Sequence, residues 1–273
     1  MSHPQIAAFA RLAQENATPT RTLSGQKTLL GRTIHDIRYD EIHDEFMVTN
    51  PLARAILIYK GGSGGEEPPV RVIQGSMTGI IGADRLEVDP VHNEILIPEG
   101  DHILVYSRTA NGNVAPLRVL EGPDTQLMDA EALVVDPVNN LLFVGTQDRR
   151  MARGGGSILV YNRTASGNTK PIRVIHGPKT GIVRIKQMEV YPPKGWLLAA
   201  MPGRQDLREQ GGVFVGVWHV NDSGDVAPRW KLGGEKSLLK RPNGMALIPE
   251  HKEISIPDMR HNAVLTYYFP EIF

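Results

Sequence analysis

The sequence contains no cysteine, no excess of either charge and no long apolar run. Without cysteine, disulfide frameworks, thiol catalysis and thiolate metal sites are excluded. Lys plus Arg number 30 and Asp plus Glu number 30, so no net field attracts nucleic acid, and we expect no nucleic-acid partner. No stretch approaches the roughly 18 apolar residues that a membrane helix needs. We therefore expect a soluble protein without a membrane span.

Signals for export, for helices and for common catalytic sites are also missing. Met1–Ala13 lacks the basic start and the long apolar centre of a secretory signal, and the compartment stays open because a signal could precede this sequence. No segment keeps a helical apolar period over ten residues or so. No G-x-S-x-G elbow, Walker loop or HExxH motif occurs. These absences leave an all-β protein with no evident reaction.

The strongest signal that is present is an internal repeat. The segment ILVYSRTANGNVAPLRVLEGPDT from Ile103 matches ILVYNRTASGNTKPIRVIHGPKT from Ile158 at most positions, and further copies begin at Ile6, Ile56 and Val215. A period near 50 residues is typical of a propeller blade. One aromatic residue marks each copy, at successive steps of 50, 47, 55, 57 and 49 residues: Phe9, Tyr59, Tyr106, Tyr161, Trp218 and Tyr267.

Each copy has the pattern of four short strands. ILVYSR is β-branched and aromatic, NGN is a tight-turn signal, and APLRVL is a second strand with its proline at the start. EALVVDP and LLFVGT follow as two more apolar runs separated by a turn. The sequence therefore predicts one β-propeller domain over residues 1–273, built from four-stranded blades.

The number of blades follows from the run of the EALVVDP type, which we take as the innermost strand. Five such strands are expected, beginning near Asp36, Arg85, Glu131, Gln187 and Gly244. The last of them is followed by Val264–Phe269 as a third strand, and its fourth strand is missing. The N-terminal segment Pro19–Gly25 is a spare copy of that strand. We predict five blades, closed by Pro19–Gly25 beside Val264–Phe269.

A second spare segment complicates this count. IAAFAR, beginning at Ile6, has the pattern of a third strand and competes for the place of Val264–Phe269. It could form an extra edge strand, a short helix that its alanines permit, or part of a sixth blade. A six-bladed propeller therefore stays open as the alternative.

The C-terminal copy carries the clearest family pattern. Pro242-Asn243-Gly244-Met245-Ala246 is followed by a strand ending in Asp258 and by Ala263–Tyr268, and this arrangement resembles NHL-like and SMP-30 (gluconolactonase)-like propeller repeats. The resemblance implies a propeller that acts as a binding scaffold, a lyase or a lactonase, and it would allow a secreted or periplasmic protein.

In the gluconolactonase-like enzymes, a divalent cation, usually calcium, is held at the channel mouth by a Glu, an Asn and an Asp. Asn243 resembles the Asn, but His35 and Asp36 stand where the Glu is expected. From the residues themselves, a calcium site could form from Glu99, Asn243 and Asp258, because oxygen donors suit a hard cation. The alternative is that these side chains cap turns. If these three residues hold a metal for a hydrolase or lyase, His35 or His261 would be the catalytic base.

Residues at the entrances of the inner strands differ from copy to copy, whereas the apolar positions after them keep their type. Divergence into different polar types favours a binding role at the channel mouth, and the alternative is solvated loop residues of no specific role. We predict these binding residues: His35, Asp36, Asp84, Arg85, Glu131, Lys186, Gln187 and Asn243.

Arginine recurs at one place of the outermost strand, at Arg21, Arg71, Arg118 and Arg173. A basic stripe on a ligand surface is one interpretation, but the repetition favours a structural pairing of each Arg with an acid or a carbonyl of the neighbouring blade.

Two function classes remain. The first is a non-enzymatic scaffold that binds an unidentified small molecule or protein at the channel mouth, or at the polar insertions Gln147–Gly156 and Gly203–Gly212. The second is a calcium-dependent, lactonase-like hydrolase or lyase. The regular repeats, the neutral charge and the missing catalytic motif favour binding. The sequence does not identify the oligomeric state.

Overall fold

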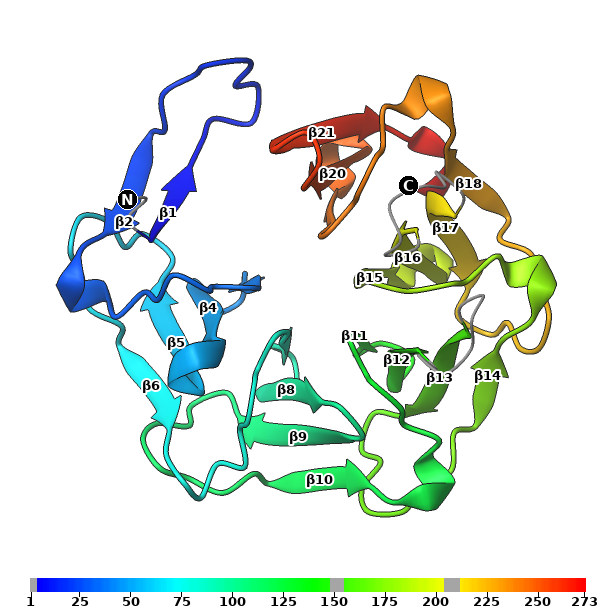
Figure 1. The fold of residues 1–273 in the computed structure, drawn as a ribbon, viewed down its shortest axis with the longest axis horizontal. Helices are drawn as coiled ribbons and strands as arrows, with labels where there is room; N and C mark the ends of the chain where they lie inside the picture. The colour runs from blue at the N-terminus through cyan, green and yellow to red at the C-terminus, as the bar shows by residue number, and fades with distance from the viewer. Residues whose placement is uncertain (1–3, 148–154, 204–211) are drawn as a thin grey trace. The chain divides into compact units, whose positions relative to one another are not determined.

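The computed structural model describes residues 4–147, 155–203 and 212–273. They divide into two compact units, which we describe separately: Met1–Glu99 with Ile103–Val119 (unit 1), and Gly100–His102 with Leu120–Phe273 (unit 2). The regular elements of the described residues are β-strands and three-residue 3-10 helices (Figure 1). No helix in this part of the chain is long and apolar enough to cross a membrane.

Four antiparallel sheets of four strands follow the repeat, each with its strands in chain order (Figure 1). Hydrogen bonds join each strand to the next, so each sheet is one predicted four-strand unit. The first two sheets are β3 (Ile37–Asp40), β4 (Glu45–Asn50), β5 (Ala55–Lys60), β6 (Arg71–Gln74) and β7 (Glu87–Asp89), β8 (Glu94–Glu99), β9 (His102–Ser107), β10 (Arg118–Glu121). The next two are β11 (Ala132–Asp136), β12 (Leu141–Gln147), β13 (Gly156–Asn162), β14 (Arg173–Ile175) and β15 (Gln187–Tyr191), β16 (Trp196–Pro202), β17 (Val213–His219), β18 (Trp230–Gly233).

The two ends of the chain form smaller sheets. At the C-terminal end, β19 (Ala246–Ile248), β20 (Glu253–Asp258) and β21 (Ala263–Tyr268) make a three-stranded sheet. At the N-terminal end, β1 (Gln5–Ala8) and β2 (Arg21–Ser24) make a two-stranded sheet. The first strands of the larger sheets, β3, β7, β11, β15 and β19, are the five predicted inner strands. IAAFAR begins as a strand, so the helix considered for it is wrong.

The pairing of the N-terminal strand differs from the predicted closure. β2 pairs with β1, in a register that places Ile6 opposite Leu23, and β21 pairs with β20. On its other edge, Leu23 forms a parallel bridge with Gly65. Both edges of β2 are therefore used. The reason is local, because a partner that is near in sequence closes a short loop at a small entropic cost.

The NGN-type turns explain how one sheet contacts the next. Gly112 has φ of +79° and forms a parallel bridge with Ile73 of the preceding sheet. The Asn111 side chain accepts a hydrogen bond from the Val72 N–H at 3.0 Å. Glycine takes this positive φ without a steric penalty. The side chain of asparagine, which is common in turns, readily forms hydrogen bonds with backbone groups. The same bridge recurs between Leu120 and Gly167.

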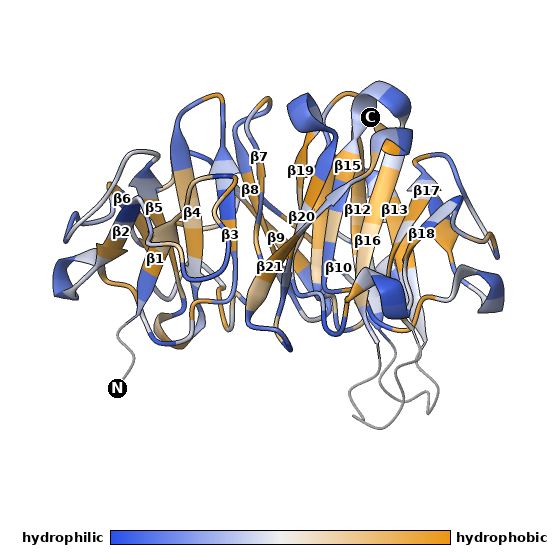
Figure 2. Cartoon of the chain, turned by 90° about the horizontal axis from the view of Figure 1, so that it is seen from above, coloured by the Kyte–Doolittle hydropathy of each residue, from blue (hydrophilic) through white to orange (hydrophobic). Residues whose placement is uncertain are grey.

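Within each unit, apolar cores lie between neighbouring sheets. Met47, Ile56 and Ile58 of one sheet cluster with Leu86 and Ile95 of the next. Of the repeated aromatic residues, Tyr59, Tyr106 and Tyr161 are fully buried, and their hydroxyls donate to the backbone carbonyls of Thr28, Thr78 and Thr125 respectively. Figure 2 shows apolar colour along the strands and polar colour at many of the connecting turns.

The recurring arginines of the fourth strands have the predicted structural role, with one difference. Arg21 donates to the Gly61 carbonyl at 2.9 Å and Arg173 to the Val220 carbonyl at 2.8 Å, each in the following copy of the repeat. Arg71, however, forms a two-pronged ion pair with Glu45 of its own sheet, as Arg118 does with Glu94. The carboxylate partners of these arginines therefore belong to the arginine's own sheet, and the carbonyl partners belong to the following copy of the repeat.

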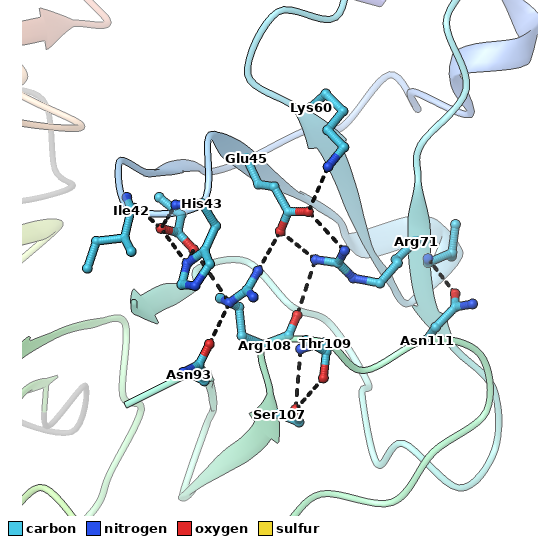
Figure 3. Close-up of polar contacts among 12 residues, drawn as sticks. Ile42, His43, Glu45, Lys60, Arg71, Asn93, Ser107, Arg108, Thr109 and Asn111 are labelled. Atoms are coloured by element: carbon cyan, nitrogen blue, oxygen red, sulfur yellow. Dashed lines mark hydrogen bonds and ion pairs between the residues drawn. The ribbon is translucent and has the colours of Figure 1, made fainter. Parts of the chain in front are cut away.

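Glu45 is the centre of a buried charge network in unit 1 (Figure 3). Its side chain is 4% exposed and also accepts from Arg108 at 2.8 Å, while Lys60 lies 3.9 Å away. Arg108 directly follows β9, a strand of the next sheet, so the network joins two sheets. The hydrogen bond from Arg71, together with the neighbouring positive charges, lowers the pKa of Glu45 despite its burial.

Candidate functional site

The entrance residues predicted in unit 1 come together ahead of β3 and β7. His35 Nδ1 lies 2.8 Å from Asp84 Oδ1. Arg85 lies 3.5 Å from Asp36 and donates to the His35 carbonyl at 3.3 Å. Asp36 also accepts from the Leu86 N–H at 3.1 Å. Neighbouring first strands thus place their entrance side chains in one cluster.

Exposure divides this cluster into two layers. The side chains of Asp36 and Arg85 are 9% and 8% exposed, and they link the two entrance segments. The side chains of His35 and Asp84 are 47% and 70% exposed, so their hydrogen-bonded pair faces solvent. A ligand could contact the outer pair, while the inner pair holds the segments in place.

One ion pair behind this cluster was not predicted from the sequence. Arg38 and Glu87 approach to 2.8 Å with side chains 11% exposed, and Arg38 also donates to the Leu86 carbonyl at 3.2 Å. They occupy equivalent positions in successive copies of the repeat. Opposite charges at one repeat position were the signal that could have revealed the pair.

Unit 2 has its own entrance cluster, centred on Glu131. Arg184 donates two hydrogen bonds to this carboxylate at 2.8 and 2.7 Å, and Lys186 lies 3.2 Å away. Two cations thus surround one carboxylate, all with side chains less than a fifth exposed. Gln187 begins β15 and is buried. Glu131 and Lys186 were predicted from the sequence and Arg184 was not, although its charge two residues before Lys186 was an available signal.

The Glu131 cluster predicts a pH dependence of stability. Burial alone would raise the pKa of Glu131, but the Arg184 hydrogen bonds and the Lys186 charge outweigh it, so the pKa lies below its ordinary 4.5. A lowered folded-state pKa gives stability that is present above the unfolded-state pKa and is lost as pH falls through the folded one. Glu131→Gln should therefore flatten the fall of the urea midpoint below about pH 4.5.

The exposed Glu121→Gln substitution in the same unit is the matched control, and it should keep the wild-type slope. If Glu131→Gln also keeps that slope, the ion pairs of this cluster do not stabilise the fold.

The predicted calcium ligands Glu99 and Asp258 each hold a loop. Glu99 accepts from the N–H groups of Ile81, Gly82 and Ala83 at 2.8–3.1 Å. Burial raises the pKa of Asp258, but its backbone hydrogen bonds outweigh this and lower the pKa overall. Asp258 accepts from four backbone N–H groups at 2.8–3.2 Å, those of Lys240, Arg241, Arg260 and His261.

Asn243 lies next to Asp258, as the calcium hypothesis requires. Pro242 forms an antiparallel bridge with Asp258, and the Asn243 N–H donates to the Pro257 carbonyl at 3.0 Å. Two of the three predicted ligands are therefore neighbours in unit 2, whereas Glu99 belongs to unit 1. The described residues contain no group of three or more His, Asp or Glu side chains placed to hold a metal ion.

The remaining candidates are His261 and the two insertions. His261 lies with Nε2 2.7 Å from the Leu238 carbonyl oxygen, within the same loop region that Asp258 organises. Most of the predicted recognition loops Gln147–Gly156 and Gly203–Gly212, residues 148–154 and 204–211, lies outside the described residues.

Comparison with solved structures supports the fold class. The chain is similar to a chain of a nidogen/laminin complex, with a TM-score of 0.61 and 14% identity over 86% of this chain and 76% of that one. It is also similar to the hydrazine synthase of Kuenenia stuttgartiensis, with a TM-score of 0.57 and 8% identity over 82% of this chain and 55% of that one. At these identities the likeness shows the fold alone.

With the five first strands, these likenesses confirm the predicted all-β propeller class with five blades. No family model matches the chain, and no curated protein matches its sequence. The resemblance to NHL-like and SMP-30-like repeats therefore stays a prediction.

Proposed function

We propose that this chain is a non-enzymatic binding propeller whose ligand contacts the entrance ends of the first strands, at the channel mouth. The exposed His35–Asp84 pair carries the proposal. It joins two predicted entrance residues at 2.8 Å and still leaves both side chains about half or more open to solvent. The pair offers a carboxylate oxygen and an imidazole nitrogen side by side, which suits a polar small molecule with both donor and acceptor groups.

The rest of the cluster gives this pair a fixed position. Arg85 donates to the His35 carbonyl, and the buried Asp36 accepts from the Leu86 N–H just before β7. Groups held in place before binding lose less conformational entropy when the ligand arrives. A preorganised, solvent-facing polar pair is therefore what a binding site at this position needs.

A screen of polar small-molecule fragments by saturation-transfer NMR tests the proposal. Fragments that bind wild-type protein should lose at least about tenfold in affinity to Asp84→Ala, a loss of about 1.4 kcal/mol. Glu67→Ala, an exposed carboxylate of the same unit, is the matched control and should bind as wild type does. Fragments that bind both variants equally would refute a site at His35 and Asp84.

A calcium-dependent lactonase-like activity is the second candidate, favoured by the neighbouring positions of Asn243 and Asp258. Against it, the oxygens of Asp258 already accept four backbone hydrogen bonds. A bound calcium would have to share the lone pairs that hold these loops.

A further inference from the structure

The loop that leads into β7 is held by a single carboxylate of unit 1. Glu99, the last residue of β8, accepts hydrogen bonds from the three N–H groups of Ile81–Ala83 at 2.8–3.1 Å. The register of the sheet explains this contact. β7 and β8 are antiparallel with Glu87 opposite Leu96, so the end of β8 extends past the start of β7. The side chain at this end therefore meets the backbone of the residues that precede β7.

The loop conformation that Glu99 holds includes an unfavourable backbone angle. Ala83 has φ of +40°, in the left-handed region that residues other than glycine rarely occupy. Its N–H donates to Glu99 at 2.8 Å, and a hydrogen bond to an ionised acceptor is stronger than one between neutral groups. Ala83 also packs in the apolar cluster that contains Ile80 and Leu86. The loop is therefore fixed from two sides, by the carboxylate and by the core.

This loop sets the direction of Asp84. Asp84 follows Ala83 directly in the chain, so its backbone starts from the residue whose N–H is held by Glu99. The Asp84 carboxylate oxygen lies 2.8 Å from His35 Nδ1, a contact that joins the entrances of two different sheets. A change of the backbone at Ala83 would turn the carboxylate away from this imidazole.

His35 is fixed by a separate strand end. The N–H of the next residue, Asp36, donates to the Thr49 hydroxyl at 3.0 Å, and the Thr49 N–H donates to the Asp36 carbonyl at 3.2 Å. Thr49 lies one residue before the end of β4. The end of β4 thus places His35, and the end of β8 places Asp84. Each half of the pair depends on the second strand of its own sheet.

We propose that Glu99 is a positioning residue of the entrance site. It acts through the backbone of Ile81–Ala83 and directs the Asp84 carboxylate toward His35. The part of this role that concerns a ligand rests on the proposed function, whereas the geometry of the pair does not. A ligand would meet a carboxylate and an imidazole that are already placed, so less conformational entropy is lost on binding.

The tautomer of His35 reports whether Asp84 is in place. An ionised carboxylate only accepts hydrogen bonds, so the Nδ1 atom beside it carries the proton, and this bond selects the Nδ1–H tautomer of the neutral ring. Nitrogen NMR of histidine-labelled protein at about pH 8, where an ordinary imidazole is neutral, distinguishes the two tautomers. His35→Gln identifies the signals. We expect Glu99→Ala to lose the Nδ1–H signature of His35, as Asp84→Ala does.

Glu94→Ala is the matched control, because Glu94 begins the same strand and pairs with Arg118 away from the loop. It should lower stability and keep the wild-type tautomer of His35. Glu99→Gln keeps one acceptor oxygen and should give intermediate signals. Unchanged His35 signals in Glu99→Ala would overturn the proposal, and so would the same loss of signature in Glu94→Ala. If Glu99→Ala does not fold, unchanged signals in Glu99→Gln would overturn it.

Fragment binding separates the positioning role from the proposed function. Fragments that need Asp84 should lose affinity in Glu99→Ala by the factor measured for Asp84→Ala, and an unchanged affinity would overturn the role toward a ligand. If no fragment binds the wild type but Glu99→Ala still changes the His35 tautomer, the proposed function fails and the positioning of Asp84 stands. If fragments bind at Asp84 and the tautomer is unchanged in Glu99→Ala, the positioning role fails and the proposed function stands.

Discussion

Replacing Glu45 by alanine is expected to lower the free energy of unfolding by about 3–5 kcal/mol. The Glu45 side chain is 4% exposed and is paired with Arg71 and Arg108. Without it, two largely buried guanidinium groups would lose their carboxylate, and an unpaired buried charge has a large desolvation penalty. Urea unfolding of the wild type and of Glu45→Ala, followed by fluorescence, measures the difference.

Glu41→Ala is the control for this measurement, because Glu41 is exposed and four residues away. It should change stability by less than about 0.5 kcal/mol. If Glu45→Ala costs no more than this control, the network in Figure 3 does not hold the two sheets together.

Replacing Asp258 by alanine should lower the free energy of unfolding by about 3 kcal/mol, whether or not calcium is present. The residue is 1% exposed, and its carboxylate satisfies four backbone N–H groups in two loops. Losing an acceptor leaves buried donors unsatisfied, which costs more than the hydrogen bonds themselves contribute. Differential scanning calorimetry with and without calcium measures the effect.

Asp258→Asn keeps one acceptor oxygen and should fall between the wild type and Asp258→Ala. Asp124→Ala removes an exposed carboxylate from the same unit and should be close to neutral. A stability loss in Asp258→Ala that appears only with calcium would show that the residue serves a metal and not the loops.

The repeat made the strands predictable because it compares each segment with its own copies. The buried Tyr59, Tyr106 and Tyr161 mark the third strands of three sheets, and Gly65, Gly112 and Gly167 in the turns after these strands take the positive φ that the turns need. These features depend on residues that are only a few positions apart in the sequence, so the repeat pattern is sufficient to predict them. The grouping of His35, Asp36, Asp84 and Arg85 followed from the same alignment of copies.

Features that depend on the choice between partners were not predictable. The sequence offers β2 two third strands of similar pattern, and only the structure shows that it pairs with Gln5–Ala8. Arg184 was missed because alignment by position singled out Lys186, although both residues contact Glu131. Similarly, a carboxylate's bonds to backbone N–H groups, as at Glu99, leave no sequence pattern that separates them from metal ligation.

A calcium titration of the melting temperature tests the central claim most directly. If the chain is a binding propeller whose Glu99 and Asp258 hold loops, millimolar calcium after removal of metal by a chelator should leave the melting temperature of wild-type protein unchanged. A saturable rise that Asn243→Ala abolishes would contradict the account, because it would show a calcium site where we place only backbone contacts.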